Sequence, residues 1–264
     1  MGTLGLIGIP YIVAGFAVGF VVGMTGAGGG SLMTPALVLL FGVHPATAVG
    51  TDLLYAAITK ACGTAVHHIG DTIAWRVVGL LTGGSLPASL LTLIVLDRLR
   101  VGDRALLWSL ITHILGWALL LTTASLLLRR QILVVAHRLS LHRRPRMEAT
   151  ATVLLGILLG VLVSASSVGA GAIGVTGLVL LYPHFPIKRI VGTDIAYALP
   201  LNLVAGLGHL AIGTVNLALL TYLLLGSLPG IALGSWIAPR ASERALRLFL
   251  AVVLAIVGAR LLLR

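Results

Sequence analysis

The chain has 264 residues, of which 58% are hydrophobic and only 9% charged, and its mean hydropathy is +1.11. Soluble domains carry about 25% charged residues, so this composition excludes an ordinary soluble protein. At about 20 residues per bilayer crossing, the chain has room for about eight to ten spans and for no sizeable domain outside the membrane. The sequence therefore predicts an all-α polytopic membrane protein.

The charge balance is strongly basic, with 18 Lys and Arg against 7 Asp and Glu and a net charge of +11. Almost all of the basic residues lie in short gaps between apolar runs, as the positive-inside rule describes. We therefore expect the lipid bilayer and no nucleic acid as a partner, and a multi-pass location in the inner cell membrane. The single cysteine, Cys62, excludes an intrachain disulfide and a cysteine metal cluster.

Two of the apolar runs are too short to cross a bilayer. The runs cover 4–23, 31–42, 46–66, 75–96, 105–128, 149–164, 172–182, 190–211, 217–238 and 245–263. Those at 31–42 and 172–182 have 12 and 11 residues, and each follows a Gly-rich stretch. We predict half-helices or re-entrant segments at these two places.

The main hydrophilic gap, 129–147, contains six arginines and no acidic residue. We predict that it is a cytoplasmic linker, because uncompensated arginines beside two spans oppose translocation. Its mixed apolar and basic pattern favours a short helix lying on the anionic leaflet. The linker separates a first transmembrane repeat, 1–128, from a second, 148–264.

An internal repeat connects the two halves. The segment PALVLLFGVHPATAVGTDLLYA (35–56) aligns with TGLVLLYPHFPIKRIVGTDIAYA (176–198), at an offset of 141 residues up to Pro45 and of 142 after one inserted residue. The Gly-Ser-Leu-Pro elements at 84–87 and 226–229 also match at an offset of 142. Repeats with Gly-interrupted short helices point to a secondary transporter whose site lies where the repeats meet. If the short segments cross, each half has five spans and the repeats are inverted. If they dip and return, each half has four and the repeats are parallel; we predict inversion.

The run GMTGAGGGSLMTPALVLLFGVHPATAVGTDLLYA (23–56), its weaker copy after residue 160 and the shared Gly-Ser-Leu-Pro element resemble the sulfite exporter TauE/SafE family of membrane permeases. The resemblance covers essentially the whole chain. It implies transport of small sulfur-containing anions, such as sulfite, sulfoacetate or other sulfonates, generally outward. The sequence departs from the pattern at 166–171, Ser-Ser-Val-Gly-Ala-Gly, where the first half has three consecutive glycines. This departure weakens the expectation that both loops hold the ligand equally.

The Gly-rich loops are the first candidate for the substrate site. Glycine lets the backbone unwind at membrane depth, and its N–H groups together with the positive end of the following short helix suit an oxyanion. The predicted substrate-binding residues are Thr25, Gly26, Gly28, Gly29 and Gly30 in the first loop and Ser164, Ser166, Ser167, Gly169 and Gly171 in the second. Close helix packing is the alternative, and we favour it for the Gly-x-x-x-Gly positions elsewhere.

A polar stripe follows each loop at helical spacing. The stripes contain Asp52, Tyr55, Lys60 and His67 in the first half and Asp194, Tyr197, Asn202 and His209 in the second. Lys60 and Asn202 complete the predicted substrate site. Three interpretations of Lys60 stay open: it attracts the anion, pairs with Asp52 or Asp194, or extends to the interface.

The other stripe residues, Asp52, Tyr55, His67, Asp194, Tyr197 and His209, are candidates for ion coupling or for a structural role. Each aspartate follows Gly-Thr shortly after a proline, so it could simply accept hydrogen bonds from N–H groups early in its helix. Histidine titrates near neutral pH, but at a helix end an interfacial position is the commoner outcome.

These patterns predict a secondary transporter of a small anionic substrate by alternating access. We expect no catalytic residue, no metal and no cofactor, because Walker and Gly-x-Ser-x-Gly motifs are absent from the sequence. The alternatives are a permease for another organic anion, or for a cation held by Asp52 and Asp194, an intramembrane enzyme that uses Ser166, His209 and Asp194, and a noncatalytic assembly partner. The sequence leaves the identity of the anion, the coupling ion, the direction and a homo-oligomer open.

Overall fold

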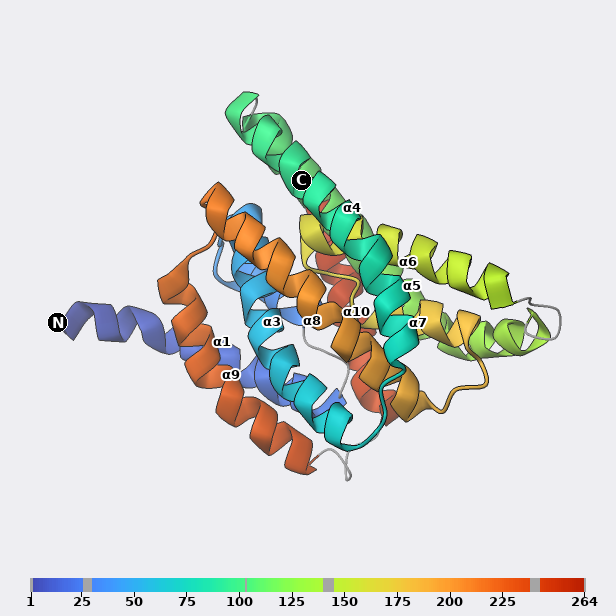
Figure 1. Cartoon of the computed structure of the whole chain (residues 1–264). Coiled ribbons are helices and arrows are strands. Elements are labelled where there is room, and N and C mark those ends of the chain that lie inside the picture. The colour runs from blue at the N-terminus through green and yellow to red at the C-terminus, as the bar shows by residue number, and fades with distance from the viewer. Residues whose placement is uncertain (1, 26–29, 103, 140–144, 238–242, 264) are drawn as a thin grey trace.

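The computed structural model describes residues 2–25, 30–102, 104–139, 145–237 and 243–263, which form ten helices and no strand (Figure 1). The first half contains α1 (Gly2–Thr25), α2 (Gly30–Leu40), α3 (Pro45–Ile69), α4 (Trp75–Gly102) and α5 (Arg104–Leu139). The second contains α6 (Pro145–Ser166), α7 (Ala172–Leu181), α8 (Ile187–Ile212), α9 (Leu217–Ile237) and α10 (Glu243–Leu262). The predicted all-α fold is confirmed.

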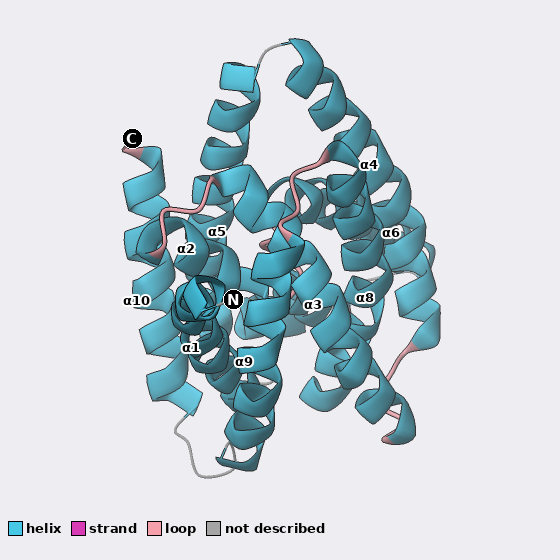
Figure 2. Cartoon of the chain, turned by 90° about the vertical axis from the view of Figure 1, so that its left-hand side faces the viewer, coloured by secondary structure: helices cyan, strands magenta, loops and turns pink. Residues whose placement is uncertain are grey.

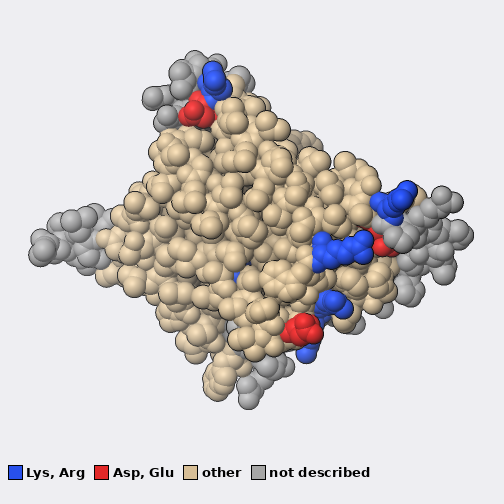
Figure 3. Space-filling model, in the orientation of Figure 1, with Lys and Arg blue, Asp and Glu red and all other residues tan. Residues whose placement is uncertain are grey.

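In the described part of the chain, five helices are long and apolar enough to cross a membrane, within 75–99, 109–128, 146–166, 187–212 and 217–234. Their outer faces carry large apolar side chains such as Leu91 and Trp117, each 64% exposed. Figure 3 shows charged side chains at the top and toward the lower right of one face, with a broad, almost uncharged surface over the rest of its described part. Such a surface suits lipid tails, since a water-soluble protein rarely exposes large contiguous apolar patches.

The two short helices occur where the sequence predicted them. α2 has 11 residues and α7 has 10, which at 1.5 Å per residue is about 15–17 Å, or half of the hydrocarbon thickness. Neither can cross a bilayer alone. Figure 2 shows α5 and α10 on one side of the molecule and α4, α6 and α8 on the other, with α3 between them.

The fifth helix is longer than the sequence analysis predicted. α5 continues without a break to Leu139, so residues 129–139 extend it instead of forming a separate interfacial helix. The segment RRQILVVAHRL contains no glycine or proline, and its residues are compatible with a helix, so nothing local ends α5 at the first arginine. Residues 140–144 lie outside the described part of the chain.

The C-terminal ends of α3 and α8 make the same set of histidine–threonine hydrogen bonds. Nδ1 of His67 lies 2.7 Å from Oγ1 of Thr72, and Nδ1 of His209 lies 2.9 Å from Oγ1 of Thr214. Each threonine hydroxyl also donates to the backbone carbonyl of its histidine. The two sets of hydrogen bonds are 142 residues apart, which is the offset of the sequence repeat.

α3 and α8 pack side by side and run antiparallel. Gly50, near the start of α3, lies against His209 and Thr214 at the end of α8, while Gly192, near the start of α8, lies against His67. Each helix therefore begins where the other ends. These contacts are reciprocal in the predicted repeat, because Gly50 and Gly192 lie 142 residues apart, as do His67 and His209.

Glycines also join the two halves at the outer helix pairs, α1 with α9 and α4 with α6. Gly19 in α1 meets the backbone of Ser227 in α9, and Gly160 in α6 meets the backbone of Ser85 in α4. A Cβ atom at either glycine would overlap the facing carbonyl oxygen. This confirms the packing interpretation for Gly160, because only glycine allows the helix backbones to approach this closely.

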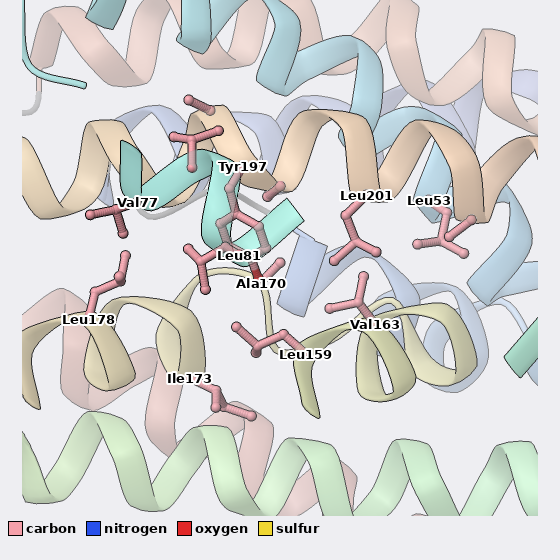
Figure 4. Packing of buried hydrophobic residues seen from close by; sticks show 14 of the residues in the cluster. Leu53, Val77, Leu81, Leu159, Val163, Ala170, Ile173, Leu178, Tyr197 and Leu201 are labelled. Atoms are coloured by element: carbon pink, nitrogen blue, oxygen red, sulfur yellow. The ribbon is translucent and has the colours of Figure 1, made fainter. Parts of the chain in front are cut away.

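The interior consists of two apolar clusters. The larger one draws residues from α3, α4, α6, α7 and α8, and Figure 4 shows part of it, including Leu53, Leu81, Leu159 and Tyr197. Ala170, in the loop between α6 and α7, belongs to the same cluster. The second loop predicted to bind substrate is therefore held against the middle of the fold.

Candidate functional site

The first Gly-rich loop is only partly described. Thr25 ends α1 and Gly30 begins α2, but Gly26, Gly28 and Gly29 lie outside the described residues, as do the surroundings of Thr25 and Gly30. The site predicted from this loop therefore stays a prediction, and the geometry that follows comes from the second loop.

The second loop, 167–171, breaks the chain between α6 and α7. Its backbone enters the left-handed region twice, at Ser167 (φ +58°) and at Gly169 (φ +122°). Glycine is favoured at the second of these positions, because a side chain rarely adopts that conformation. Gly171 precedes α7, and no side chain caps the helix there.

Two of the predicted serines are occupied by contacts within the protein. Ser164 donates its hydroxyl to Oγ of Ser89 at 2.6 Å, and Ser166 donates to the carbonyl of Leu162 at 2.6 Å. Ser167 differs from them, since its buried hydroxyl lies close to the Asp52 carboxylate and has no hydrogen-bond partner among the described residues. The structure thus brings Ser167, and not Ser164 or Ser166, to the charged part of the site.

Backbone donors remain open at the start of α7. In the described part of the chain, the N–H groups of Ala170, Ala172 and Ile173 have no hydrogen-bond acceptor. Ala170 and Ile173 are buried. Open N–H groups at a helix start carry partial positive charge, so this end of α7 has the polarity that an oxyanion requires.

Lys60 reaches this loop from α3. Its side chain is 4% exposed, and its ammonium donates a hydrogen bond of 3.2 Å to the carbonyl oxygen of Ala170. The interpretation that Lys60 extends to the membrane interface is therefore wrong. No carboxylate oxygen of a described residue lies within 4.0 Å of the ammonium, although it interacts electrostatically with Asp194 and, more weakly, with Asp52.

The two aspartates are buried on either side of Lys60. Oδ2 of Asp52 accepts hydrogen bonds from the hydroxyl of Thr34 at 2.6 Å and from its backbone N–H at 3.2 Å. The capping interpretation assumed that Asp52 accepts hydrogen bonds from N–H groups of its own helix. Asp52 instead accepts hydrogen bonds from Thr34 in α2. Asp194 is 2% exposed and lies against the backbone of Gly174 in α7.

Both tyrosines and the asparagine of the two stripes are also buried. Tyr55 and Tyr197 are 1% and 0% exposed, and Asn202, which holds the repeat position of Lys60, is 2% exposed. Oη of Tyr197 and Oδ1 of Asn202 have no hydrogen-bond partner among the described residues. Both stripes therefore face the interior and not lipid.

The two histidines at the helix ends differ in burial. His209 is 1% exposed, and besides Thr214 it contacts the carbonyl of Ser164, 2.8 Å from Nε2. His67 is partly exposed. The interfacial interpretation therefore fails for His209, which joins the end of α8 to α6.

The arrangement also bears on the enzyme alternative. Both the Ser166 hydroxyl and Nε2 of His209 are engaged with carbonyl oxygens. Among the described residues no hydrogen bond joins Ser166 to His209, so the nucleophile and base of a hydrolytic site are not assembled here.

Two clefts lie at the ends of helices. One has a volume of about 330 Å³ and is lined by residues that include Arg76, Glu148 and Arg189. The other has a volume of about 440 Å³ and is lined by residues that include His44 and His113. Neither of these two clefts is lined by Lys60 or the aspartates, so the charged group between α3 and α8 lies outside both.

Two partners in this group, Thr34 and the Ala170 carbonyl, were not predicted from the sequence. Thr34 is a polar residue inside an apolar half-helix, directly before a proline, and this was the available signal. Its repeat position carries Val175, so comparing the halves hides it. The Ala170 carbonyl has no side-chain signal, because any residue supplies the same acceptor.

The fold and the buried charges define the class: a multi-pass helical membrane protein with a polar centre between two half-helices. The chain belongs to the sulfite exporter TauE/SafE family of membrane transporters, whose sequence profile matches residues 11–261. It is similar to the probable membrane transporter protein YjnA of Bacillus subtilis, with 35% identity over 96% of this chain and 99% of the relative. The probable membrane transporter proteins YdhB of B. subtilis, at 28% identity over 85% and 87% of the two chains, and of Xylella fastidiosa, at 27% over 89% and 86%, are more distant. No solved structure matches the chain significantly.

Proposed function

We propose that the protein is a secondary transporter of a small sulfur-containing anion, such as sulfite, sulfoacetate or another sulfonate. The observation that carries this proposal is the contact between the buried Lys60 ammonium and the loop at the start of α7. A charged side chain inside a membrane protein costs at least about 2.5 kcal/mol and usually faces a polar cavity or a partner. The open N–H groups beside it suit the oxygens of a sulfonate.

The family supports the chemical class of the substrate. The family's description names sulfite export, and the relatives are named as probable membrane transporters. The site adds a cation and backbone donors without a bulky side chain at Ala170. A small oxyanion matches that environment, because it needs several donors and little space.

We infer that transport proceeds by alternating access between inverted repeats. The antiparallel course of α3 and α8 and the reciprocal glycine contacts support opposite orientations of the halves. The half-helices α2 and α7, with Lys60 bonded to the loop before α7, support this mechanism, because transporters with inverted repeats hold their substrates at interrupted helices.

The test is uptake into proteoliposomes by the purified protein. The panel contains sulfite, sulfate, sulfoacetate, taurine and acetate, with liposomes lacking protein as the control. The expected result is saturable uptake of sulfite or a sulfonate, and no uptake of acetate or of other anions supplied as sodium salts. Cation-dependent flux without anion uptake would favour the permease that uses Asp52 and Asp194, and product formation in detergent would favour an enzyme.

A further inference from the structure

The two buried aspartates occupy equivalent repeat positions but have unequal surroundings. Oδ2 of Asp52 receives two hydrogen bonds from Thr34, while its Oδ1 has no partner among the described residues. Oδ1 of Asp194 is buried against Gly174 and has no hydrogen-bond partner in the described part of the chain. Donors stabilise an ionised carboxylate, so Asp52 is the carboxylate prepared to stay charged.

The charges around Lys60 do not balance when all three groups are ionised. Lys60 supplies one positive charge, Asp52 and Asp194 supply two negative charges, and Asn202 holds the position where a second lysine would complete the symmetry. The uncharged Tyr197 on α8 is the other titratable group that interacts with Asp194. An uncompensated buried charge is costly, so the group needs one further positive charge.

A proton fits this position better than a metal ion. Metal ions such as Ca²⁺ take six to eight oxygen ligands, and small cations generally need several at once. Oδ1 of Asp194 instead faces the backbone of a glycine, and the Lys60 ammonium, which interacts with Asp194, repels a second cation. A proton needs only one oxygen and neutralises the charge at that atom.

We propose that Asp194 is the proton-coupling residue of this transporter and that an anion binds beside Lys60 together with a proton on Asp194. This inference rests on the proposed anion transport. With Asp194 protonated, Lys60 and Asp52 balance each other, and the open N–H groups of α7 then receive the anion. With Asp194 ionised, the anion meets two carboxylates and one ammonium and is repelled.

Linkage turns this arrangement into a measurable pH dependence. Because one proton binds with each anion, the anion must bind more tightly as the pH falls, by about tenfold per pH unit across the range in which Asp194 titrates. The same linkage makes the net movement of the anion carry one proton in the same direction. The direction of transport then follows the combined gradients of the two ions.

The experiment uses methanesulfonate and sulfoacetate, whose charges are constant between about pH 5.5 and about pH 7.5, unlike that of sulfite. Binding is measured across this range for the wild type and for Asp194→Asn, with Asp71→Asn as the matched control. Asp71 is an exposed aspartate in the loop after α3 and outside the charged group. Proton movement is followed with a pH dye inside proteoliposomes.

We expect the wild type and Asp71→Asn to show the tenfold change per pH unit and to move one proton with each anion. Asp194→Asn imitates the protonated residue, so its affinity is expected to be independent of pH and its proton movement to vanish. Asp52→Asn is the second variant at the equivalent repeat position. If Asp52→Asn loses the pH dependence and Asp194→Asn keeps it, the assignment to Asp194 is wrong.

Other outcomes separate the coupling from the function. Anion transport by the wild type without proton movement overturns the coupling and leaves the proposed function intact. Dependence on sodium in place of protons also overturns it. Failure of the wild type to bind or transport any anion of the panel refutes the proposed function, and with it the basis of the inference.

Discussion

Replacing Lys60 with methionine removes the single cation in the group between α3 and α8 and keeps the side-chain length. The ammonium is 4% exposed and contacts the Ala170 carbonyl at 3.2 Å, so water does not replace it readily. A hydrogen bond that involves a charged group contributes about 1–3 kcal/mol. If the same ammonium contacts the bound anion, its loss weakens anion affinity about 5- to 150-fold.

The assay is equilibrium binding of a sulfonate to purified protein, followed by uptake into proteoliposomes. The chain offers a matched control, because its other lysine, Lys188, is exposed near the start of α8. We expect Lys188→Met to bind like the wild type. Lys60→Arg is expected to restore binding only in part, since the flat guanidinium needs more room than the ammonium.

Lys60→Gln separates the loss of the charge from a loss of folded protein. It keeps an N–H donor for the Ala170 carbonyl and loses only the charge. Wild-type affinity in folded Lys60→Met or Lys60→Gln protein would refute the reasoning. The lysine would then balance Asp52 and Asp194 structurally, and the open N–H groups of α7 would hold the anion alone.

Three further predictions test the packing, the helix ends and the orientation. Gly169→Leu is expected to abolish uptake by protein that still reaches the membrane. Gly230 packs against the α1 backbone, so Gly230→Leu is expected to lower the yield of folded protein. Size-exclusion profiles and uptake measurements check this prediction, and equal yields of the two variants would contradict it. His209→Ala is expected to lower stability by about 2–4 kcal/mol and His67→Ala by about 1 kcal/mol. Of the two histidines, only His209 is fully buried and bonded at both ring nitrogens. Thermal unfolding of the two variants in detergent tests this difference. Residue 140 lies in the predicted cytoplasmic linker and outside the described residues. A single cysteine placed there, in a chain otherwise free of cysteine, is expected to resist an impermeant reagent added to intact cells. Labelling from outside would place the linker on the opposite side of the membrane.

The helices themselves could be predicted from the sequence, because their signals are local. Short apolar runs after Gly-rich stretches correctly located α2 and α7. The end of α5 could not be found in this way, since charge marks where a span leaves the hydrocarbon and not where a helix ends. Arginine is a good helix former, so the helix continues to Leu139.

The candidate site was less predictable, because its contacts join distant segments. Helical spacing grouped Asp52, Lys60 and His67 on one predicted stripe of α3, but it could not say what faces that stripe. Thr34 and Ala170 are 18 and 110 residues from their partners, and neither carries a motif. Tertiary packing alone brings them together.

The duplicated frame and the unequal centre have different physical causes. Frame contacts pair one half with the other, so a glycine such as Gly50 and its counterpart Gly192 meet equivalent neighbours and are constrained alike. The charged centre has no such reciprocity, because one ammonium is shared by both carboxylates. A lysine in place of Asn202 would balance both aspartates and leave no need for a proton. The difference between Lys60 and Asn202 is therefore what leaves the buried group one positive charge short.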